Sequence, residues 1–218
     1  IMTFLRETIW HSFTFSTCNR SIKFVFVTFV LKLTVFSRPI WGYVAIAFNK
    51  VDVDRLKAVG PDRLCAEWVM KNGGGVRTVE MPGHIIRDYN SLPPESSKLH
   101  IKEVDGTEAS LMKIGLEHFN GCKYIDTVIL SNCKHLEEDG LEGLRHLRST
   151  LRDLQVSGCY NIGDEGLKVI GELKQLKEFK IFDMRYVKNL DTVVKELQSQ
   201  LPDSLNSPKK MILNVIML

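Results

Sequence analysis

A short pattern that recurs three times at a nearly constant interval restricts the fold of this chain more than any other feature of its sequence. The two best copies are Ile125–Cys133 and Leu151–Cys159, in which the apolar residues follow the spacing LxxLxLxxC. A third copy, Leu176–Met184, follows after almost the same interval. One such unit cannot bury its own apolar face, so neighbouring units must stack on one another. The pattern therefore predicts a stack of similar units in the C-terminal half of the chain.

This spacing is typical of the leucine-rich repeat in its cysteine-containing form. Each repeat is expected to contain a short strand, a turn and a helix, with helices over Asp139–Leu147 and Asp164–Leu173. The predicted fold class is α/β: a short leucine-rich repeat solenoid of about four repeats with an α-helical N-terminal cap. A stack this short needs a cap at each end, because its terminal units would otherwise expose their apolar faces.

An earlier and more degenerate repeat is expected before the two best copies. Counting back one interval from Cys133 leads to Thr107, and the same step aligns Val104 with Leu130. In this alignment the apolar residues upstream of Val104 are out of phase with the pattern. We expect the repeats to begin near Val76.

The repeated cysteines, Cys133 and Cys159, are expected to point into the turn after each strand. A small and weakly polar side chain fits there against backbone groups. The alternative is a reactive thiol of Cys133 paired with His135. The chain has five cysteines and no CxxC pair, which predicts neither a disulfide framework nor a zinc site.

A helical module is expected to close the N-terminal end of the stack. This module occupies residues 41–75 and contains helices over Val51–Val59 and Asp62–Lys71. Asp62 is a candidate N-cap of the second helix, because a carboxylate can accept the first free backbone N–H groups. The glycines that begin at Gly73 end this helix by allowing a positive φ.

The C-terminal half of the chain is expected to end in a second cap. The repeats and the helix of this cap together occupy residues 76–201. The cap consists of an amphipathic helix over Leu190–Leu201 and the apolar tail Met211–Leu218. Residues 202–218 form a tail whose apolar part is Met211–Leu218.

Residues 1–40 differ in composition from the rest of the chain. They contain five basic residues and one acidic residue, and they are rich in Ser, Thr and Phe. This composition is typical of a mitochondrial presequence, although Val, Phe and Thr favour strands over the amphipathic helix of such a segment. The alternative is an N-terminal segment that was wrongly assigned. Because the whole chain carries a net charge of +3, the remainder is nearly neutral, which does not favour nucleic-acid binding.

Several short motifs occur in an order that resembles one known family. In chain order they are WG at 41–42, FNKVD at 48–52, DR at 54–55, VGPDR at 59–63, EW at 67–68, VR at 76–77 and DYNSLP at 88–93. Together with the repeats they resemble the mitochondrial ATP synthase subunit s family, also called coupling factor B, over about residues 41–200. Related assembly proteins of the distal membrane arm of respiratory complex I share this fold.

The resemblance implies a non-enzymatic accessory protein, peripherally associated with the matrix side of the mitochondrial inner membrane. Its partners would be proteins of the membrane sector of ATP synthase, with no small-molecule substrate. It would keep proton flow coupled to ATP synthesis by blocking a leak. One alternative is an assembly factor of complex I. The other is a ubiquitin-ligase adaptor, because Leu92–Glu95 resembles the start of an F-box.

The resemblance also implies a magnesium ion between the N-terminal module and the first repeats. Its ligands would be the backbone carbonyl of Gly73 and the side chain of Thr107, and Asp105 would attract the cation. Magnesium takes oxygen ligands and keeps most of its waters, so two protein ligands suffice for a weak site. The alternative is that Gly73 only ends a helix and Thr107 only continues a strand.

The strand positions between the repeated leucines are expected to face solvent and to bind a protein partner. The candidate binding residues are Arg152, Gln155, Lys180 and Phe182. The alternative is an ordinary solvated face. The sequence contains no Ser–His–Asp order and no paired catalytic carboxylates, which favours a binding protein over an enzyme.

Overall fold

The computed structural model describes residues 42–201 and 211–214 of the 218-residue chain. The chain divides into two compact units, Ile1–Val44 and Ala45–Leu218. The predicted presequence therefore lies outside the described residues. We describe the second unit, which holds the repeats and the candidate site.

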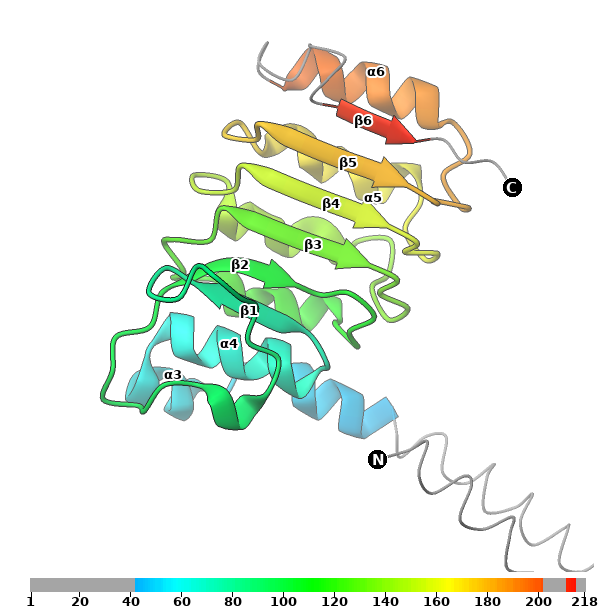
Figure 1. Ribbon diagram of the computed structural model, residues 1–218. Coiled ribbons are helices and arrows are strands. Elements are labelled where there is room, and N and C mark those ends of the chain that lie inside the picture. The colour runs from blue at the N-terminus through cyan, green and yellow to red at the C-terminus, as the bar shows by residue number, and fades with distance from the viewer. Residues whose placement is uncertain (1–41, 202–210, 215–218) are drawn as a thin grey trace, which may run out of the picture. The chain divides into compact units, whose positions relative to one another are not determined.

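A single six-stranded sheet forms one layer of this unit (Figure 1). The strands follow one another in chain order; they are β1 (Gly75–Thr78), β2 (Ile101–Asp105), β3 (Thr127–Ser131), β4 (Asp153–Ser157), β5 (Glu178–Phe182) and β6 (Met211–Asn214). Strand β1 runs antiparallel to β2, and all later neighbours are parallel. On its other side, β1 pairs at Val76 with Ile86 through two backbone hydrogen bonds of 2.7 and 2.9 Å.

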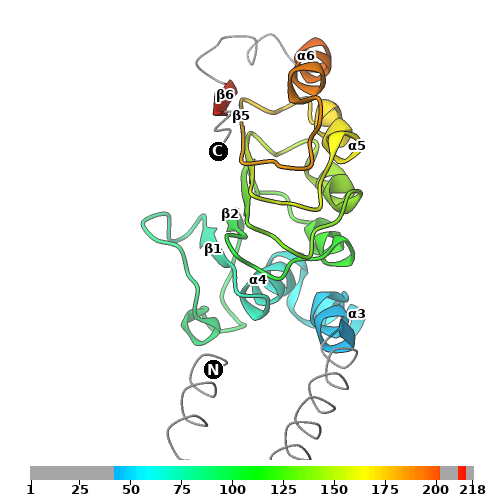
Figure 2. The ribbon, with the colours of Figure 1, turned by 90° about the vertical axis from the view of Figure 1, so that its right-hand side faces the viewer.

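Helices cover one face of the sheet and form the second layer (Figure 2). They are the 3-10 helices η2 (Lys113–Phe119), η3 (Gly140–Leu147) and η4 (Lys168–Glu172) and the α-helices α5 (Asp164–Leu167) and α6 (Leu190–Gln200). The apolar core lies between the two layers. No helix among the described residues is long and apolar enough to cross a lipid bilayer. The predicted α/β class is thus confirmed.

The strand register follows the sequence period in the three central strands. Val128 of β3 pairs with Leu154 of β4, and Leu154 pairs with Phe179 of β5. These three residues occupy the same place in the three copies of the sequence pattern. All three side chains are buried, because alternate residues of a strand point to opposite faces and these point to the helices.

The earlier repeat has a different register from the one that the sequence predicts. Val104 pairs with Val128 and not with Leu130, so this step is shorter than the step from Val128 to Leu154. The shorter step places Gly106 opposite Leu130, where the side chain of Leu111 fills the space that a leucine would occupy. In this register the counterpart of Cys133 is Ala109, which is also buried. Thr107 is therefore not the counterpart of Cys133.

Two further expectations about the N-terminal part are wrong. The strand near Val76, where the repeats are predicted to begin, is antiparallel and so does not repeat the later strands. Helices α3 (Val53–Val59) and α4 (Pro61–Lys71) are present, but Gly60 is the N-cap of α4. Pro61 starts that helix, and the carboxylate of Asp62 accepts a hydrogen bond of 3.0 Å from the backbone N–H of Ile101.

The predicted repeat helices are present, though mostly as 3-10 helices. Glycines allow the helices of successive repeats to approach closely. A Cβ atom on Gly143 would lie 2.3 Å from Cβ of Leu116 in η2, and one on Gly166 would lie 2.2 Å from the carbonyl oxygen of Glu138. The C-terminal helix is confirmed as α6, and strand β6 then extends the sheet beside β5.

Candidate functional site

The first part of the site is the turn that follows α4. Asn72 ends the helix, and Gly73 takes a left-handed conformation with φ of 90°. Its N–H group donates a hydrogen bond of 3.0 Å to the carbonyl of Met70. Within the described chain, the carbonyl of Gly73 accepts no backbone or side-chain hydrogen bond. No other group of the described residues therefore competes for this carbonyl.

Each glycine of the Gly73-Gly74-Gly75 run has a structural cause. Gly73 needs its positive φ. A Cβ atom on Gly74 would lie 2.7 Å from Cγ1 of Val69 and 2.8 Å from the carbonyl oxygen of Asp105. A Cβ atom on Gly75 would lie 2.9 Å from Cγ of Arg87. Gly74 therefore fits tightly against α4 and β2, and Gly75 fits tightly against the segment 85–87.

The second part of the site is the end of strand β2. The Asp105 carboxylate is buried, and its Oδ1 atom accepts two hydrogen bonds from Thr107. The backbone N–H of Thr107 donates at 2.9 Å and the hydroxyl at 2.6 Å. The other oxygen of Asp105, Oδ2, accepts from the guanidinium group of Arg87.

The two parts lie side by side. Gly75 pairs with Asp105 across β1 and β2, and the backbone N–H of Ser110 donates a 2.9 Å hydrogen bond to the carbonyl of Asn72. The residues on either side of Gly73 thus contact the residues on either side of Thr107. The turn that carries Gly73 and the turn that carries Thr107 are therefore adjacent in the fold, although they lie far apart along the chain.

The available donors can be compared with what a magnesium ion requires. Within the described residues, no three His, Cys, Asp or Glu side chains gather in a way that could hold a metal. The oxygens that the sequence resemblance assigns to the ion are instead the carbonyl of Gly73 and the hydroxyl of Thr107. Because this hydroxyl gives its proton to Asp105, its lone pairs remain available. Two oxygen donors suit a magnesium ion that keeps most of its waters.

The four predicted protein-binding residues lie on or beside β4 and β5, away from the helices. Gln155 and Lys180 are neighbours across these strands. The Lys180 ammonium pairs with Glu178 at 2.9 Å, and Phe182 is half-buried at the end of β5. Arg152 is exposed just before β4.

Carboxylates gather at the start of the same strands. Burial, followed by the charges of Glu178 and Asp126, raises the pKa of Asp153. This open face is therefore mixed in charge, with its acidic side chains at one edge.

The repeated cysteines take the structural role that the sequence predicts. The thiol of Cys133 donates to the carbonyl of Gly106 at 3.1 Å, and that of Cys159 donates to the carbonyl of Leu130 at 3.5 Å. Both residues are fully buried. The adjacent thiol of Cys159, followed by burial, raises the pKa of Cys133. These observations argue against the alternative of a reactive thiol, because the reactive form is an accessible thiolate.

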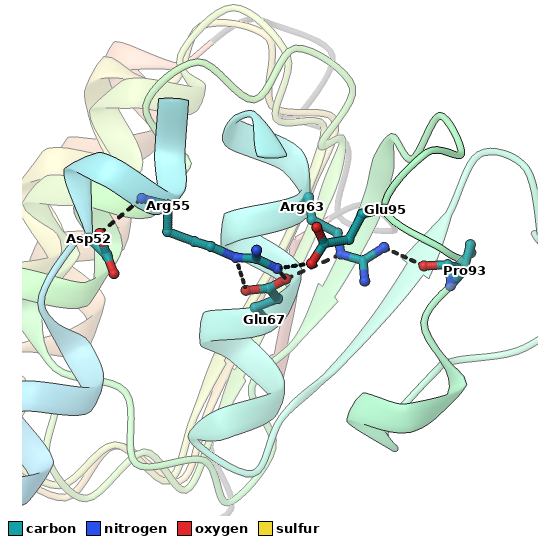
Figure 3. A network of polar contacts seen from close by, with 6 residues as sticks. All are labelled: Asp52, Arg55, Arg63, Glu67, Pro93 and Glu95. Carbon is teal, nitrogen blue, oxygen red and sulfur yellow. Dashed lines mark hydrogen bonds and ion pairs between the residues drawn. The ribbon is translucent and has the colours of Figure 1, made fainter. Parts of the chain in front are cut away.

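An ionic network around the buried Glu67 side chain does not follow from the repeat pattern of the sequence (Figure 3). The side chain of Glu67 is only 1% exposed and lies between two arginines, with Nη2 of Arg55 at 2.6 Å and Nε of Arg63 at 3.2 Å. Arg55 also pairs with Glu95 at 2.5 Å, and Arg63 donates to the carbonyl of Pro93. The network therefore fixes the β1–β2 connection to helices α3 and α4.

The arginines keep the buried carboxylate charged. Burial raises the pKa of Glu67, but the hydrogen bonds from Arg55 and Arg63 outweigh burial and hold this pKa below its usual value. The three residues are among the motifs that carry the family resemblance. Their contact could not be predicted, because Arg55 and Glu67 lie on different helices.

Comparison with known proteins identifies relatives over most of the chain. No known protein-family profile matches it. The human protein named ATP synthase subunit s, mitochondrial, is 33% identical over 170 residues, which cover 76% of this chain and 84% of the human protein. The mouse and bovine proteins of the same name are 33% and 32% identical, with the same coverage. The chain belongs to the mitochondrial ATP synthase subunit s family.

Proposed function

We propose that this protein is a non-catalytic accessory subunit of mitochondrial ATP synthase. It acts at the matrix side of the inner membrane and keeps proton flow coupled to ATP synthesis by blocking a leak. The observation that carries this proposal is the similarity to proteins named ATP synthase subunit s over 76% of the chain. The aligned part also covers 84% of those relatives, so the similarity spans most of both chains.

We infer further that the stack is a leucine-rich repeat solenoid. The parallel register of β3, β4 and β5, which advances by one copy of the sequence pattern at each strand, supports this inference. A thiol in each of two successive turns donates to a carbonyl of the preceding unit, which also supports it.

The open face of the sheet is the proposed docking surface for a protein of the ATP synthase membrane sector. It carries Arg152, Gln155, Lys180 and Phe182. Exposed charges that surround partly buried apolar groups suit a protein partner. The acidic edge near Asp153 favours a partner that is basic at the corresponding position.

A magnesium ion is proposed at the junction of the N-terminal module and β2. The carbonyl of Gly73 and the hydroxyl of Thr107 would hold it, and Asp105 would orient that hydroxyl. The ion would join the turn after α4 to the turn after β2. Its role would be structural, because a bound cation that fixes both turns stabilises the folded state.

The proposed function can be tested by native gel electrophoresis of mitochondria that express the tagged protein. We expect the wild-type protein to migrate with ATP synthase. We also expect it to be extracted from the matrix face of the membrane more easily than an integral membrane protein. The variant Lys180→Glu should reduce this co-migration about threefold or more, since it reverses a charge on the proposed docking surface.

The variant Lys168→Glu provides a matched control. Lys168 also pairs with a nearby glutamate, Glu165 at 2.6 Å, but it lies on the helical side. It should therefore leave co-migration unchanged. Migration with intermediates of complex I would contradict the proposal and support an assembly factor, whereas a cytosolic location would support an adaptor.

A further inference from the structure

We propose that Arg87 sets the affinity of the Gly73–Thr107 site for a divalent cation, by supplying the positive charge that the buried Asp105 carboxylate needs when no cation is bound. This inference rests on the magnesium site of the proposed function. It concerns a residue that is neither of the proposed ligands.

The backbone of Arg87 is held in place on both sides. Ile86, immediately before it, forms the two-hydrogen-bond bridge to Val76 of β1. Asp88, immediately after it, caps the 3-10 helix η1 (Tyr89–Ser91) by accepting from the backbone N–H of Asn90 at 2.9 Å. Arg87 is therefore placed by the fold beside β1, and its position does not depend on its charge.

The side chain of Arg87 crosses β1 at a glycine. A Cβ atom on Gly75 would lie 2.9 Å from Cγ of Arg87, so any other residue at position 75 would displace the arginine stem. Gly75 pairs with Asp105 in the next strand. The missing side chain thus opens a direct path from Arg87 to the carboxylate.

The contact with Arg87 uses the last free oxygen of Asp105. Thr107 occupies Oδ1 with two hydrogen bonds, and Arg87 occupies Oδ2. The carboxylate is 8% exposed, and a charge at that depth is costly unless a group of opposite charge is close. The side chain of Arg87 is 51% exposed, so Arg87 can leave the pair and be solvated.

A cation at Gly73 and Thr107 would therefore meet a second positive charge at the same carboxylate. The two cations repel each other, and Arg87 must move away or lower the affinity. The charge of Arg87 then determines the concentration at which magnesium binds. The ion pair between Arg87 and Asp105 thus keeps the site folded when no metal is bound, and the site can still bind magnesium.

Calorimetric titration of the full chain with magnesium chloride tests this inference. The variant Arg87→Gln keeps a polar side chain and removes the charge, so its dissociation constant should be about tenfold lower than that of the wild-type protein. Arg87→Lys, which keeps the charge, should bind as the wild-type protein does.

Arg77→Gln is the matched control. Arg77 lies on β1 and pairs with Glu103 of β2 at 2.9 Å, as Arg87 pairs with Asp105 of β2. Its replacement by glutamine also removes one positive charge. It should leave the dissociation constant unchanged. Equal affinities for the wild-type protein and Arg87→Gln would overturn the inference about Arg87 while leaving the magnesium site in place.

A second pair of variants covers the case in which Arg87→Gln does not fold. In Asp105→Asn the buried negative charge is absent. Arg87 can then be replaced without leaving a buried carboxylate unpaired. Arg87→Gln combined with Asp105→Asn should bind magnesium more tightly than Asp105→Asn alone. If neither the wild-type protein nor Arg87→Gln releases or absorbs heat while both are folded by circular dichroism, the magnesium site itself is wrong and the inference falls with it.

Discussion

At the scale of single residues, close packing and burial decide which side chains this fold accepts. Gly74 has no room for a methyl group, because Val69 and the backbone of Asp105 lie 2.7 and 2.8 Å from its missing Cβ atom. His118 is buried against Trp68, with parallel rings whose centroids are 4.8 Å apart. These residues join α4 to β2 and to η2, and each gives a measurable prediction.

Gly74→Ala should lower the free energy of unfolding by about 1–3 kcal/mol, because the added methyl group overlaps the Val69 side chain and the Asp105 carbonyl. The measurement is urea denaturation followed by circular dichroism. Gly83→Ala is the control, since nothing lies within 4 Å of its added carbon atom and its stability should not fall. Equal stabilities of the two variants would show that Gly74 is not closely packed.

His118 predicts a dependence of stability on pH. Burial lowers the pKa of His118 from its usual 6.5, while its ring nitrogen Nδ1 lies 2.8 Å from the carbonyl oxygen of Gly115. The unfolded chain therefore binds a proton below pH 6.5 that the folded chain does not. Stability should be complete above this pH and fall as the pH decreases toward the folded pKa, by up to about 1.4 kcal/mol per pH unit.

His118→Phe keeps the stacking on Trp68 and removes the titrating group. Its free energy of unfolding, measured from neutral to mildly acidic pH, should change less with pH than that of the wild-type protein. His84→Gln replaces an exposed histidine and should keep the wild-type dependence. If the free energy of unfolding of His118→Phe changes with pH as steeply as that of the wild-type protein, other groups cause the pH dependence.

At the scale of helices and strands, side chains of one repeat complete the elements of the next. The carboxylate of Glu138 accepts hydrogen bonds of 3.0 and 2.8 Å from the backbone N–H groups of Gly163 and Gly166, at the start of α5. Gly163 has no side chain that could cap this helix, so the preceding repeat provides the cap. Arg145 similarly reaches Glu172 with two hydrogen bonds of 2.8 Å, but both side chains are about half exposed.

Glu138→Ala should destabilise the protein by about 1–2 kcal/mol, because two N–H groups at the start of a helix lose a charged acceptor. Arg145→Ala should cost less than about 1 kcal/mol, since an exposed ion pair contributes little. Thermal unfolding of both variants would measure the difference. A larger loss of stability in Arg145→Ala than in Glu138→Ala would show that the exposed ion pair contributes more than the cap.

The elements were predictable where the repeat is regular and not where it shortens. The regular period of the pattern predicted β3, β4 and β5, because stacked strands keep the period of their apolar residues. The shorter step between Val104 and Val128 was missed, since Gly106 and Ala109 replace the leucine and cysteine that mark the register. The out-of-phase residues upstream of Val104 were the available signal of this shift.

The candidate site was predictable only in part. Gly73 and Thr107 came from the family resemblance, and the fold brings their turns together. Arg63 and Glu67 have the i,i+4 spacing of a single helix, but Arg87 with Asp105 and Arg55 with Glu67 pair across different elements. No spacing in the sequence encodes such contacts.

At the scale of the whole unit, stability depends on continuous stacking. Each repeat contacts the units on either side through the sheet, the helices and the buried cysteines. A charge at one buried strand position must therefore affect the entire stack and not one repeat alone.

Leu154→Asp should abolish cooperative unfolding, because it places an unpaired carboxylate at a position that is 2% exposed. The expected loss exceeds about 4 kcal/mol, and circular dichroism during heating would show it. Gln155→Asp, at the next position on β4 and on the open face, should keep a cooperative transition. A wild-type melting temperature for Leu154→Asp would mean that the strand register is wrong.

The bridge between Val76 and Ile86 has a consequence for self-association. A parallel stack of strands normally presents a bare edge, and an identical chain can pair with such an edge and start aggregation. Here the antiparallel β1 ends the parallel series, and its outer hydrogen-bonding groups at Val76 are already used by Ile86 of the same chain. A second molecule therefore finds no template at this point, and the N-terminal edge of the sheet is protected against fibril-like growth.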